Sequence, residues 1–362
     1  MSRSTRHDEP PCRTAGPGEE PDRLIGRERK RRDRPAFHAF IERGPVCSNL
    51  RRQLQAPFFL SGSRPSQPGW QAEFDCHTRW TSISDVTLGH TLPLRAVERQ
   101  RLRRASFDAN PGLYERTRPG YPAELFDDLE RLARLRSDNR VLEIGPGTGQ
   151  ATLPLAERGL AVTAVELSPR MARRCRRNLS GHPRVEVLAT GFESWPVEES
   201  AYDLVFAASA FHWLPARIAY PRAARALRSD GRLALVWHFR ITPDNEFQRE
   251  LNAVYHATGM RPWRARPPEE RIRRQREAIL NSARFGPVTI CRYPRIRRYL
   301  AEEYIDLLRT MSDHAIRPPA VKRRLFAGIR RVFARHGGVF EQPFVAGLLV
   351  ASKRRTRQLD SP

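Results

Sequence analysis

Residues 141–150 read VLEIGPGTGQ, a short apolar run that passes into three glycines at alternate positions. The apolar run is typical of a buried strand, and the residues after the loop have the pattern of a helix. Glycine suits the turn between them because it lets the backbone bend sharply and lets a ligand come close. The start of the following helix offers unpaired N–H groups. The segment therefore predicts a ligand-binding strand–loop–helix unit.

The glycine spacing distinguishes between possible ligands. A dinucleotide fingerprint places glycines at positions one, three and six of the loop, whereas Gly145, Gly147 and Gly149 occupy positions one, three and five. A phosphate loop of the Walker type would need Gly-Lys-Ser/Thr, which does not follow. Glu143 precedes the loop by two residues, where it would repel a pyrophosphate but could accept hydrogen bonds from an amino group. A ligand with an amino-acid end is favoured.

A second acidic residue supports the same interpretation. Glu166 ends the next apolar run, 161–166, and follows Gly149 by 17 residues. A carboxylate at the end of that strand can accept hydrogen bonds from both hydroxyls of a ribose. The ligand would then carry a ribose and an amino-acid end without a phosphate, and S-adenosylmethionine fits this description.

The surrounding pattern predicts an α/β fold. Helical stretches alternate with further apolar runs, which indicates parallel βαβ units in a doubly wound sheet. Residues 239–330 are expected to be a mainly helical insertion after strand five, a lid that includes Tyr255 and Trp263. The final stretch is expected to form two strand segments around Gly347. The runs predicted as strands are 141–144, 161–166, 185–188, 202–207, 232–237 and 340–353.

The chain divides into two regions by composition. Residues 1–104 contain Pro/Gly/Ser clusters and charge runs without a sustained hydrophobic period, so we expect a disordered extension or sequence upstream of the true start. Residues 105–357 are expected to form the folded domain. No apolar run approaches the ~20 residues of a membrane-spanning helix, and no secretory signal is visible. Five scattered cysteines without zinc spacing predict no metal site and indicate a reducing cytoplasm.

The net charge of +24 raises the question of a nucleic-acid partner. The charge is spread along the whole chain, and all but three of its 64 basic residues are arginine. A dedicated nucleic-acid surface would concentrate this charge, and diffuse basic character favours only non-specific association. The composition therefore argues against a specific nucleic-acid partner.

Several motifs resemble one family. The glycine loop, Glu166 and the strand 202–205 are similar to motifs I, II and IV of class I S-adenosylmethionine-dependent methyltransferases. Further segments resemble the trans-aconitate methyltransferases, a small-molecule subgroup of methyltransferase type 11 character; these are 114–122 (with YER and RPGYP), 210–213 (AFHW) and 308–312 (LRTMS). The resemblance covers about residues 105–353 and implies a seven-stranded Rossmann-like sheet with S-adenosyl-L-methionine as cofactor.

The resemblance also implies further cofactor contacts. Tyr114 and Arg118 lie in a segment that folds over the cofactor in the family, where they would meet the methionine carboxylate. Leu167 follows the ribose-binding acid, and Gly191 and Phe192 follow strand three at the adenine end. Many relatives have an acid there, whereas this chain reads TGFE at 190–193.

The residues after strand four should face the transferred methyl group, because ligands of doubly wound sheets lie beyond the carboxyl ends of the strands. His212 is the candidate general base there, and the alternative is that it orients a neighbouring group. Trp213, and also Trp237 and His238 at the end of strand five, are candidates to border the substrate. Neither the Asn/Asp-Pro-Pro-aromatic motif of base-methylating enzymes nor a Pro-Cys nucleophile is present.

These observations predict an S-adenosylmethionine-dependent methyltransferase that acts on a small-molecule acceptor, through a carboxylate or a hydroxyl. An RNA or protein methyltransferase is the first alternative. A non-catalytic protein that binds the cofactor or a partner is the second. The sequence determines neither the oligomeric state nor the identity of the acceptor.

Overall fold

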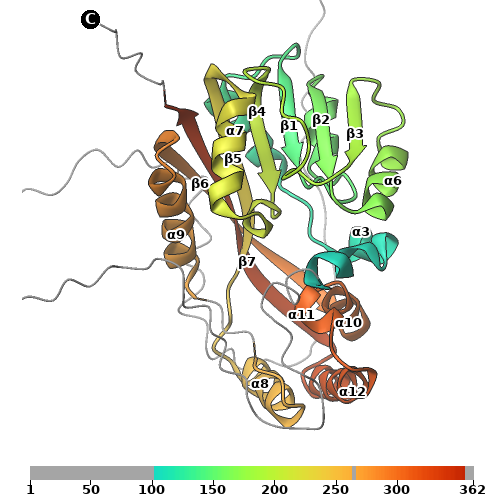
Figure 1. Cartoon of the computed structure of the whole chain (residues 1–362). Helices are drawn as coiled ribbons and strands as arrows, with labels where there is room; N and C mark the ends of the chain where they lie inside the picture. The colour runs from blue at the N-terminus through green and yellow to red at the C-terminus, as the bar shows by residue number, and fades with distance from the viewer. Residues whose placement is uncertain (1–101, 263–265, 355–362) are drawn as a thin grey trace, which may run out of the picture. The chain divides into compact units, whose positions relative to one another are not determined.

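The computed structural model describes residues 102–262 and 266–354. The predicted extension 1–104 lies almost wholly outside these residues, as do Trp263 and the last residues of the predicted domain, 355–357. The described residues form a seven-stranded sheet with helices on both faces (Figure 1).

The sheet has the doubly wound topology that the sequence predicts. Its order is β3-β2-β1-β4-β5-β7-β6, and neighbouring strands are parallel except that β7 is antiparallel to both β5 and β6. The five parallel strands are rich in apolar residues because helices cover both of their faces. The strands are β1 (Arg140–Ile144), β2 (Ala161–Glu166), β3 (Val185–Ala189), β4 (Tyr202–Ala208), β5 (Leu227–Arg240), β6 (Phe285–Leu300) and β7 (Val339–Lys353).

Alternate residues of each strand contribute to two separate cores. Val141 of β1 packs in the cluster of α4 (Ala123–Ala133), α5 (Thr152–Glu157) and α6 (Pro169–Asn178). Leu142, its neighbour, packs in the cluster of α7 (Ala216–Ala226) and α9 (Pro268–Asn281) on the opposite face. This follows from the two-residue period of a strand, in which successive side chains point to opposite faces of the sheet.

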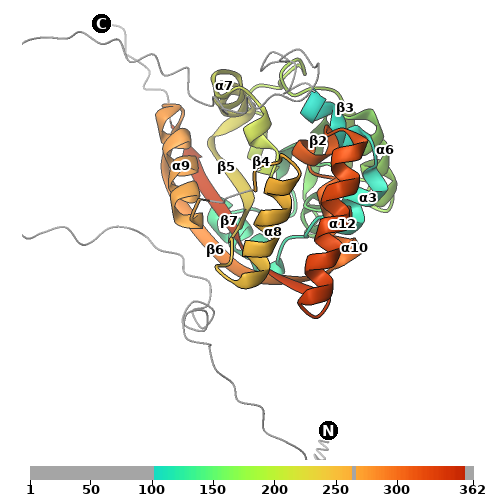
Figure 2. The same cartoon turned by 90° about the horizontal axis from the view of Figure 1, so that it is seen from below.

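A third core lies beyond the sheet, among helices of the C-terminal half. Its centre is aromatic: Phe247 stacks on Phe340 with ring centroids 4.5 Å apart, and Tyr304 and Phe333 contact the same ring. The helices are α8 (Glu246–Ala257), α10 (Ala301–Arg309), α11 (Ser312–Ala315) and α12 (Pro319–Arg335). Figure 2 shows this group from below, next to α3 (Pro111–Thr117). None of the helices in the described part of the chain has the length and apolar character to span a membrane.

Residues 239–330 contain helices α8 to α11 and most of α12, as predicted, but they also contain strand residues that were not predicted. β5 continues to Arg240, and β6 occupies Phe285–Leu300 inside the segment. The strand was missed because its sequence contains two prolines and several arginines. Both are compatible with a strand at the edge of a sheet, where one side needs no hydrogen-bond partner. Cys291 and Tyr293 still alternate toward the core.

The two segments predicted around Gly347 are one continuous strand. Gly347 pairs with Trp237 on one side and with Arg292 on the other. A Cβ at this position would lie 2.7 Å from a ring carbon of Phe239. The glycine therefore serves close packing of β7 against an aromatic side chain, and it does not interrupt the strand.

Candidate functional site

The glycine loop connects β1 to α5 with all three glycines in the left-handed region, at φ of 68° for Gly145, 62° for Gly147 and 92° for Gly149. The sequence predicted that all three glycines allow a sharp turn and the close approach of a ligand, and the structure separates their roles. A Cβ at Gly145 would lie 2.6 Å from the Cβ of Ala210, and one at Gly149 would lie 3.2 Å from the sulfur of Cys175. Only at Gly147 is the nearest atom, a ring carbon of Tyr114, at an ordinary 3.7 Å.

We expect alanine substitutions to separate these roles. Gly145→Ala adds a clash to the strain of a positive φ, so the free energy of unfolding should fall by roughly 2–5 kcal/mol. Gly147→Ala should cost only the backbone strain, ~1–2 kcal/mol, while it places a methyl group where the loop is open. Chemical denaturation measures both effects. Equal losses of stability in the two variants would contradict this assignment.

Glu143 is a buried carboxyl at the carboxyl end of β1. Only 1% of its surface is exposed, and no described residue hydrogen-bonds either carboxyl oxygen. Burial and, to a smaller extent, the charge of Glu166 raise the pKa of Glu143 to about 8, although the nearby Thr152 hydroxyl acts against this rise. A buried polar group without a partner is costly, and such groups often mark a site that a ligand completes.

Glu166 lies at the end of β2, next to the same loop. Its Oε2 accepts a hydrogen bond from the backbone N–H of Gly147 at 3.0 Å, and its Oε1 accepts one from Ser168 at 2.8 Å. Burial raises the pKa of Glu166, and these two donors act against that rise. The carboxylate therefore holds the glycine loop in place, a function that the sequence did not reveal. Each oxygen retains a further lone pair for a ligand.

An N-terminal segment crosses this edge of the sheet. It comprises η1 (Ser106–Asp108) and α3, and Arg104 precedes it in an ion pair with Glu193 at 2.8 Å. Asp108 accepts hydrogen bonds from the Ser168 hydroxyl and, at 3.1 Å, from the backbone N–H of Arg170. Sequence analysis missed these residues, because their partners are 60 or more positions away and no local pattern marks them.

The structure places Tyr114 and Arg118 next to the glycine loop. The Tyr114 ring is the nearest group to Gly147, and the guanidinium carbon of Arg118 lies 4.9 Å from the centre of that ring. Arg118 also donates from Nε and Nη2 to the side chain and the carbonyl of Thr310, at 3.1 and 2.8 Å. Two of its donors are thus already engaged with another part of the protein.

At the predicted adenine end the structure separates the three candidates. Leu167 is 47% exposed, and its Cδ1 would lie 3.3 Å from a Cβ at Gly191, so these two residues are neighbours at the surface. Phe192 instead is buried in the core cluster of α7, with the guanidinium of Arg222 over its ring. Leu167 and Gly191 can border a bound ring, whereas Phe192 supports them from the core.

His212 and Trp237 contact each other directly. His212 lies in η2 (Phe211–Trp213), and its Nδ1 accepts a hydrogen bond from the indole N–H of Trp237 at 3.3 Å. His212 is exposed at the surface of the described residues. The protein atoms packed against its ring and the positive charge of Arg271 nevertheless lower the pKa of His212 to about 4. The ring is therefore neutral at pH 7. Since Nδ1 accepts, Nε2 carries the proton and presents an N–H donor.

Arginine side chains surround this part of the site. Arg271 of α9 lies over the ring of Phe239 at 5.0 Å. Burial and the nearby charge of Arg240 lower its pKa to about 10. A positive charge that is partly desolvated and beside a second positive charge favours an anionic ligand.

His238 and Trp213, the other two residues predicted to border the substrate, each pack against an aromatic ring. His238 stacks on Tyr121 with ring centroids 4.6 Å apart, and burial, with the charge of Arg118, lowers its pKa to about 4. The Tyr121 hydroxyl donates to Ser209 at 3.4 Å. Trp213 meets the ring of Phe107 edge to face at 5.4 Å. Tyr121 was not among the predicted site residues, although its place in the RPGYP segment was a signal.

The residues present fit S-adenosylmethionine. The unpartnered carboxyl of Glu143 suits an ammonium group, and the free lone pairs of Glu166 suit ribose hydroxyls. Gly147 lies between Glu143 and Glu166 in the sequence. It has open space at its Cβ position, and its backbone N–H donates a hydrogen bond to Glu166. A sheet of this topology with this loop is the arrangement of class I methyltransferases.

Comparison with known proteins leads to the same class. Residues 141–231 match the methyltransferase domain family. A methyltransferase-like protein of Schizosaccharomyces pombe is 31% identical over 232 residues, which cover 63% of this chain and 85% of the relative. The chain therefore belongs to the S-adenosylmethionine-dependent methyltransferase family.

Two other relatives match shorter stretches. A methyltransferase of Mycobacterium tuberculosis, itself uncharacterized, is 42% identical over 135 residues, or 37% of this chain and 53% of the relative. The malonyl-[acyl-carrier protein] O-methyltransferase of Geobacter sulfurreducens is 37% identical over 121 residues, or 33% of this chain and 43% of the relative. The chain thus spans about half the length of the mycobacterial relatives that it matches.

Proposed function

We propose that this protein transfers the methyl group of S-adenosylmethionine to a carboxylate oxygen of a small-molecule acceptor. The observation that carries the proposal is the buried pair of carboxyl groups, Glu143 and Glu166, at the ends of adjacent parallel strands beside the glycine loop. S-adenosylmethionine supplies a methyl group already activated by its sulfonium, which leaves as a neutral thioether.

The residues of the chain would then bind and orient. Glu143 accepts hydrogen bonds from the ammonium of the amino-acid end, and Glu166 accepts them from the ribose while it holds the loop. Tyr114 covers the amino-acid end from α3, and Leu167 and Gly191 border the adenine. Holding a nucleophile in line at ~3 Å from the methyl group is the main requirement of such a reaction.

The acceptor chemistry is inferred from the donors that surround His212. The Nε2–H of the neutral imidazole and the guanidinium of Arg271 are both donors, and Arg240 adds positive charge beside them. These groups suit an anionic oxygen. A carboxylate is ionised at pH 7 and needs no base, so a bond from oxygen to the methyl carbon forms as the carbon–sulfur bond breaks. The negative charge of the carboxylate and the positive charge of the sulfonium cancel. The O-methyltransferase named among the relatives is consistent with this class of acceptor.

The experiment that tests the proposal uses S-adenosylmethionine labelled in the methyl group. The full chain is incubated with small carboxylic acids from a cell extract, and with RNA and protein fractions in parallel. Methyl esters release labelled methanol in mild base, whereas N-methyl groups and ethers do not. Base-labile label in the acid fraction supports the proposal. Base-stable label, or label only in RNA or protein, would replace it with one of the alternative acceptors.

Substitution of His212 tests whether it positions the acceptor or removes a proton. We expect His212→Ala to lower kcat/KM by roughly ten- to a hundredfold, the effect of one hydrogen bond to a charged group. His212→Gln places an amide N–H near the position of Nε2 and should recover most of the activity. With a pKa of about 4 for His212, the wild-type rate should not titrate between pH 5.5 and 8 through this residue. A titration near pH 6.5 that disappears in both variants would instead identify a general base.

A further inference from the structure

The helix α3 lies against the glycine loop and is held there from the loop side. Gln150 donates from Nε2 to the backbone carbonyls of Glu115 and Arg118, at 3.1 and 3.4 Å. The ring of Tyr114 is the nearest group to the open position at Gly147. The placement of this ring therefore determines the shape of the predicted pocket for the amino-acid end of the cofactor.

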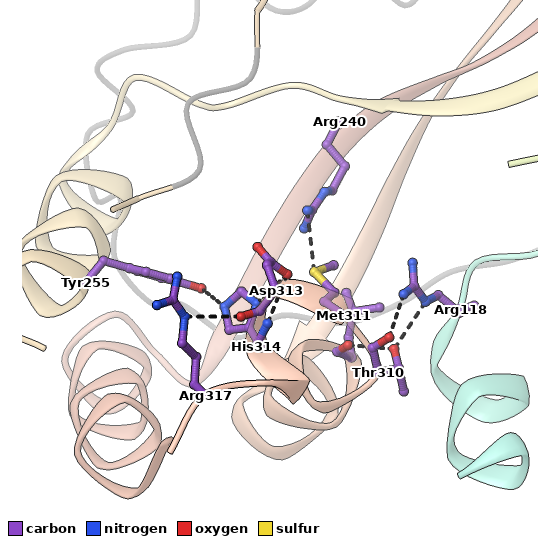
Figure 3. A network of polar contacts seen from close by, with 9 residues as sticks. Arg118, Arg240, Tyr255, Thr310, Met311, Asp313, His314 and Arg317 are labelled. Atoms are coloured by element: carbon purple, nitrogen blue, oxygen red, sulfur yellow. Dashed lines mark hydrogen bonds and ion pairs between the residues drawn. The ribbon is translucent and has the colours of Figure 1, made fainter. Parts of the chain in front are cut away.

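The other side of α3 is held by a residue 192 positions away in the sequence. Arg118 donates from Nε to the hydroxyl of Thr310 at 3.1 Å and from Nη2 to its carbonyl at 2.8 Å (Figure 3). The Thr310 hydroxyl donates its own proton to the carbonyl of Leu307 at 2.7 Å, so its lone pairs face Arg118. The guanidinium held in this way lies 4.9 Å from the centre of the Tyr114 ring.

The corner formed by residues 310–314 is itself anchored to two further elements. Arg240, at the end of β5, contacts the sulfur of Met311 at 3.6 Å. Nδ1 of His314 is 2.9 Å from Asp313, and Nε2 is 2.8 Å from the hydroxyl of Tyr255 on α8 (Figure 3). Residues 310–314 therefore contact both Arg118, which lies beside the glycine loop, and Arg240, which lies near Arg271.

We propose that Thr310 is a positioning residue for the cofactor site: its hydroxyl fixes the guanidinium of Arg118, which in turn holds the Tyr114 ring over Gly147. Arg118 then acts on the cofactor through Tyr114 and through the position of α3. The inference rests on the proposed function, because it assumes that the cofactor lies at the glycine loop. It thereby assigns a supporting role in the cofactor site to the residue that ends α10.

The test compares Thr310→Val with Thr310→Ser in the full chain. Valine keeps the shape of the side chain and removes the hydroxyl, whereas serine keeps the hydroxyl. Calorimetry with S-adenosylhomocysteine should show an affinity roughly five- to thirtyfold lower for the valine variant. This is less than the full effect of a hydrogen bond to a charged group, because Arg118 keeps its contact with the Thr310 carbonyl and acts on the cofactor indirectly. The serine variant should bind like the wild type. Thr258→Val is the matched control, since the Thr258 hydroxyl also caps a helix end, on α8, by donating to a backbone carbonyl.

Hydrogen exchange without any ligand provides a second measurement. The amides at the end of α3, including that of Arg118, should exchange several-fold faster in the valine variant than in the serine variant, while those of α12 stay unchanged. Equal cofactor affinity and equal exchange in the valine variant and the wild type would overturn the positioning role and leave the proposed function intact. Absence of S-adenosylhomocysteine binding by the wild type would overturn both the positioning role of Thr310 and the proposed function. If the valine and serine variants both bound S-adenosylhomocysteine equally more weakly than the wild type, the loss of affinity would not come from the hydroxyl, and the positioning role would be overturned.

Discussion

Glu166→Ala should lower the affinity for S-adenosylhomocysteine by at least a hundredfold, measured by calorimetry. The substitution has two consequences that add. It removes the proposed ribose acceptor, and hydrogen bonds that involve a charged group each contribute ~1.5–3 kcal/mol. It also removes the acceptor for the backbone N–H groups of Gly147 and Ser168, so that the loop is no longer held in its binding conformation.

A matched control separates a specific effect from a general loss of charge. Glu186 is an exposed glutamate on the adjacent strand β3, and Glu186→Ala removes the same group without touching the loop. This variant should bind like the wild type. An unchanged dissociation constant in Glu166→Ala would exclude the proposed role of Glu166, because neither the ribose contact nor the support of the loop could then matter.

The affinity for the cofactor should also depend strongly on pH because of Glu143. The pKa of this carboxyl in the free protein is raised from its ordinary 4.5 to about 8, so at pH 7 it is mostly protonated. An ammonium group binds the ionised form, so binding releases a proton below pH 8. The affinity should therefore rise by about tenfold for each pH unit from 6 toward 8. Above pH ~8 the rise should level off, because Glu143 is then already ionised in the free protein.

Calorimetry in buffers of different ionisation enthalpy measures the proton release directly. Glu143→Gln removes the titrating group and keeps the size of the side chain. This variant should bind roughly a hundredfold more weakly at pH 8, since a charge-assisted hydrogen bond is lost. It should show no rise in affinity between pH 6 and 7.5. A wild-type affinity that stays flat over that range would contradict the assignment of Glu143 to the ammonium.

Local patterns in the sequence predicted much of the fold. The apolar runs 161–166 and 202–207 correspond closely to β2 and β4, because strands covered on both faces are predominantly apolar. The glycine loop and the two acids predicted a ligand type, because glycine spacing and acidic residues at the ends of apolar runs can be recognised in the sequence.

Contacts between distant segments decided the rest. β6 was missed because an edge strand needs neither a full apolar pattern nor every hydrogen bond, and only its pairing with β7 identifies it. Gly145 was interpreted as a turn residue and Gly347 as a break between two strand segments. In the structure a larger residue at either position would collide with a side chain from a distant segment, Ala210 at Gly145 and Phe239 at Gly347.

The sequence by itself determined the class of fold and indicated the glycine loop and the two acids as candidates for the cofactor site, because these depend on short periods and local motifs. Only the tertiary structure decided what the candidate residues can do. The hydrogen bond from Trp237 leaves Nε2 of His212 as a donor, and the protein packed around the ring, with the charge of Arg271, lowers its pKa so that the ring is neutral at pH 7. Thr310, far along the chain, engages Arg118 next to the cofactor loop. Protonation states and hydrogen-bond partners depend on groups brought together in space, and no local pattern records them.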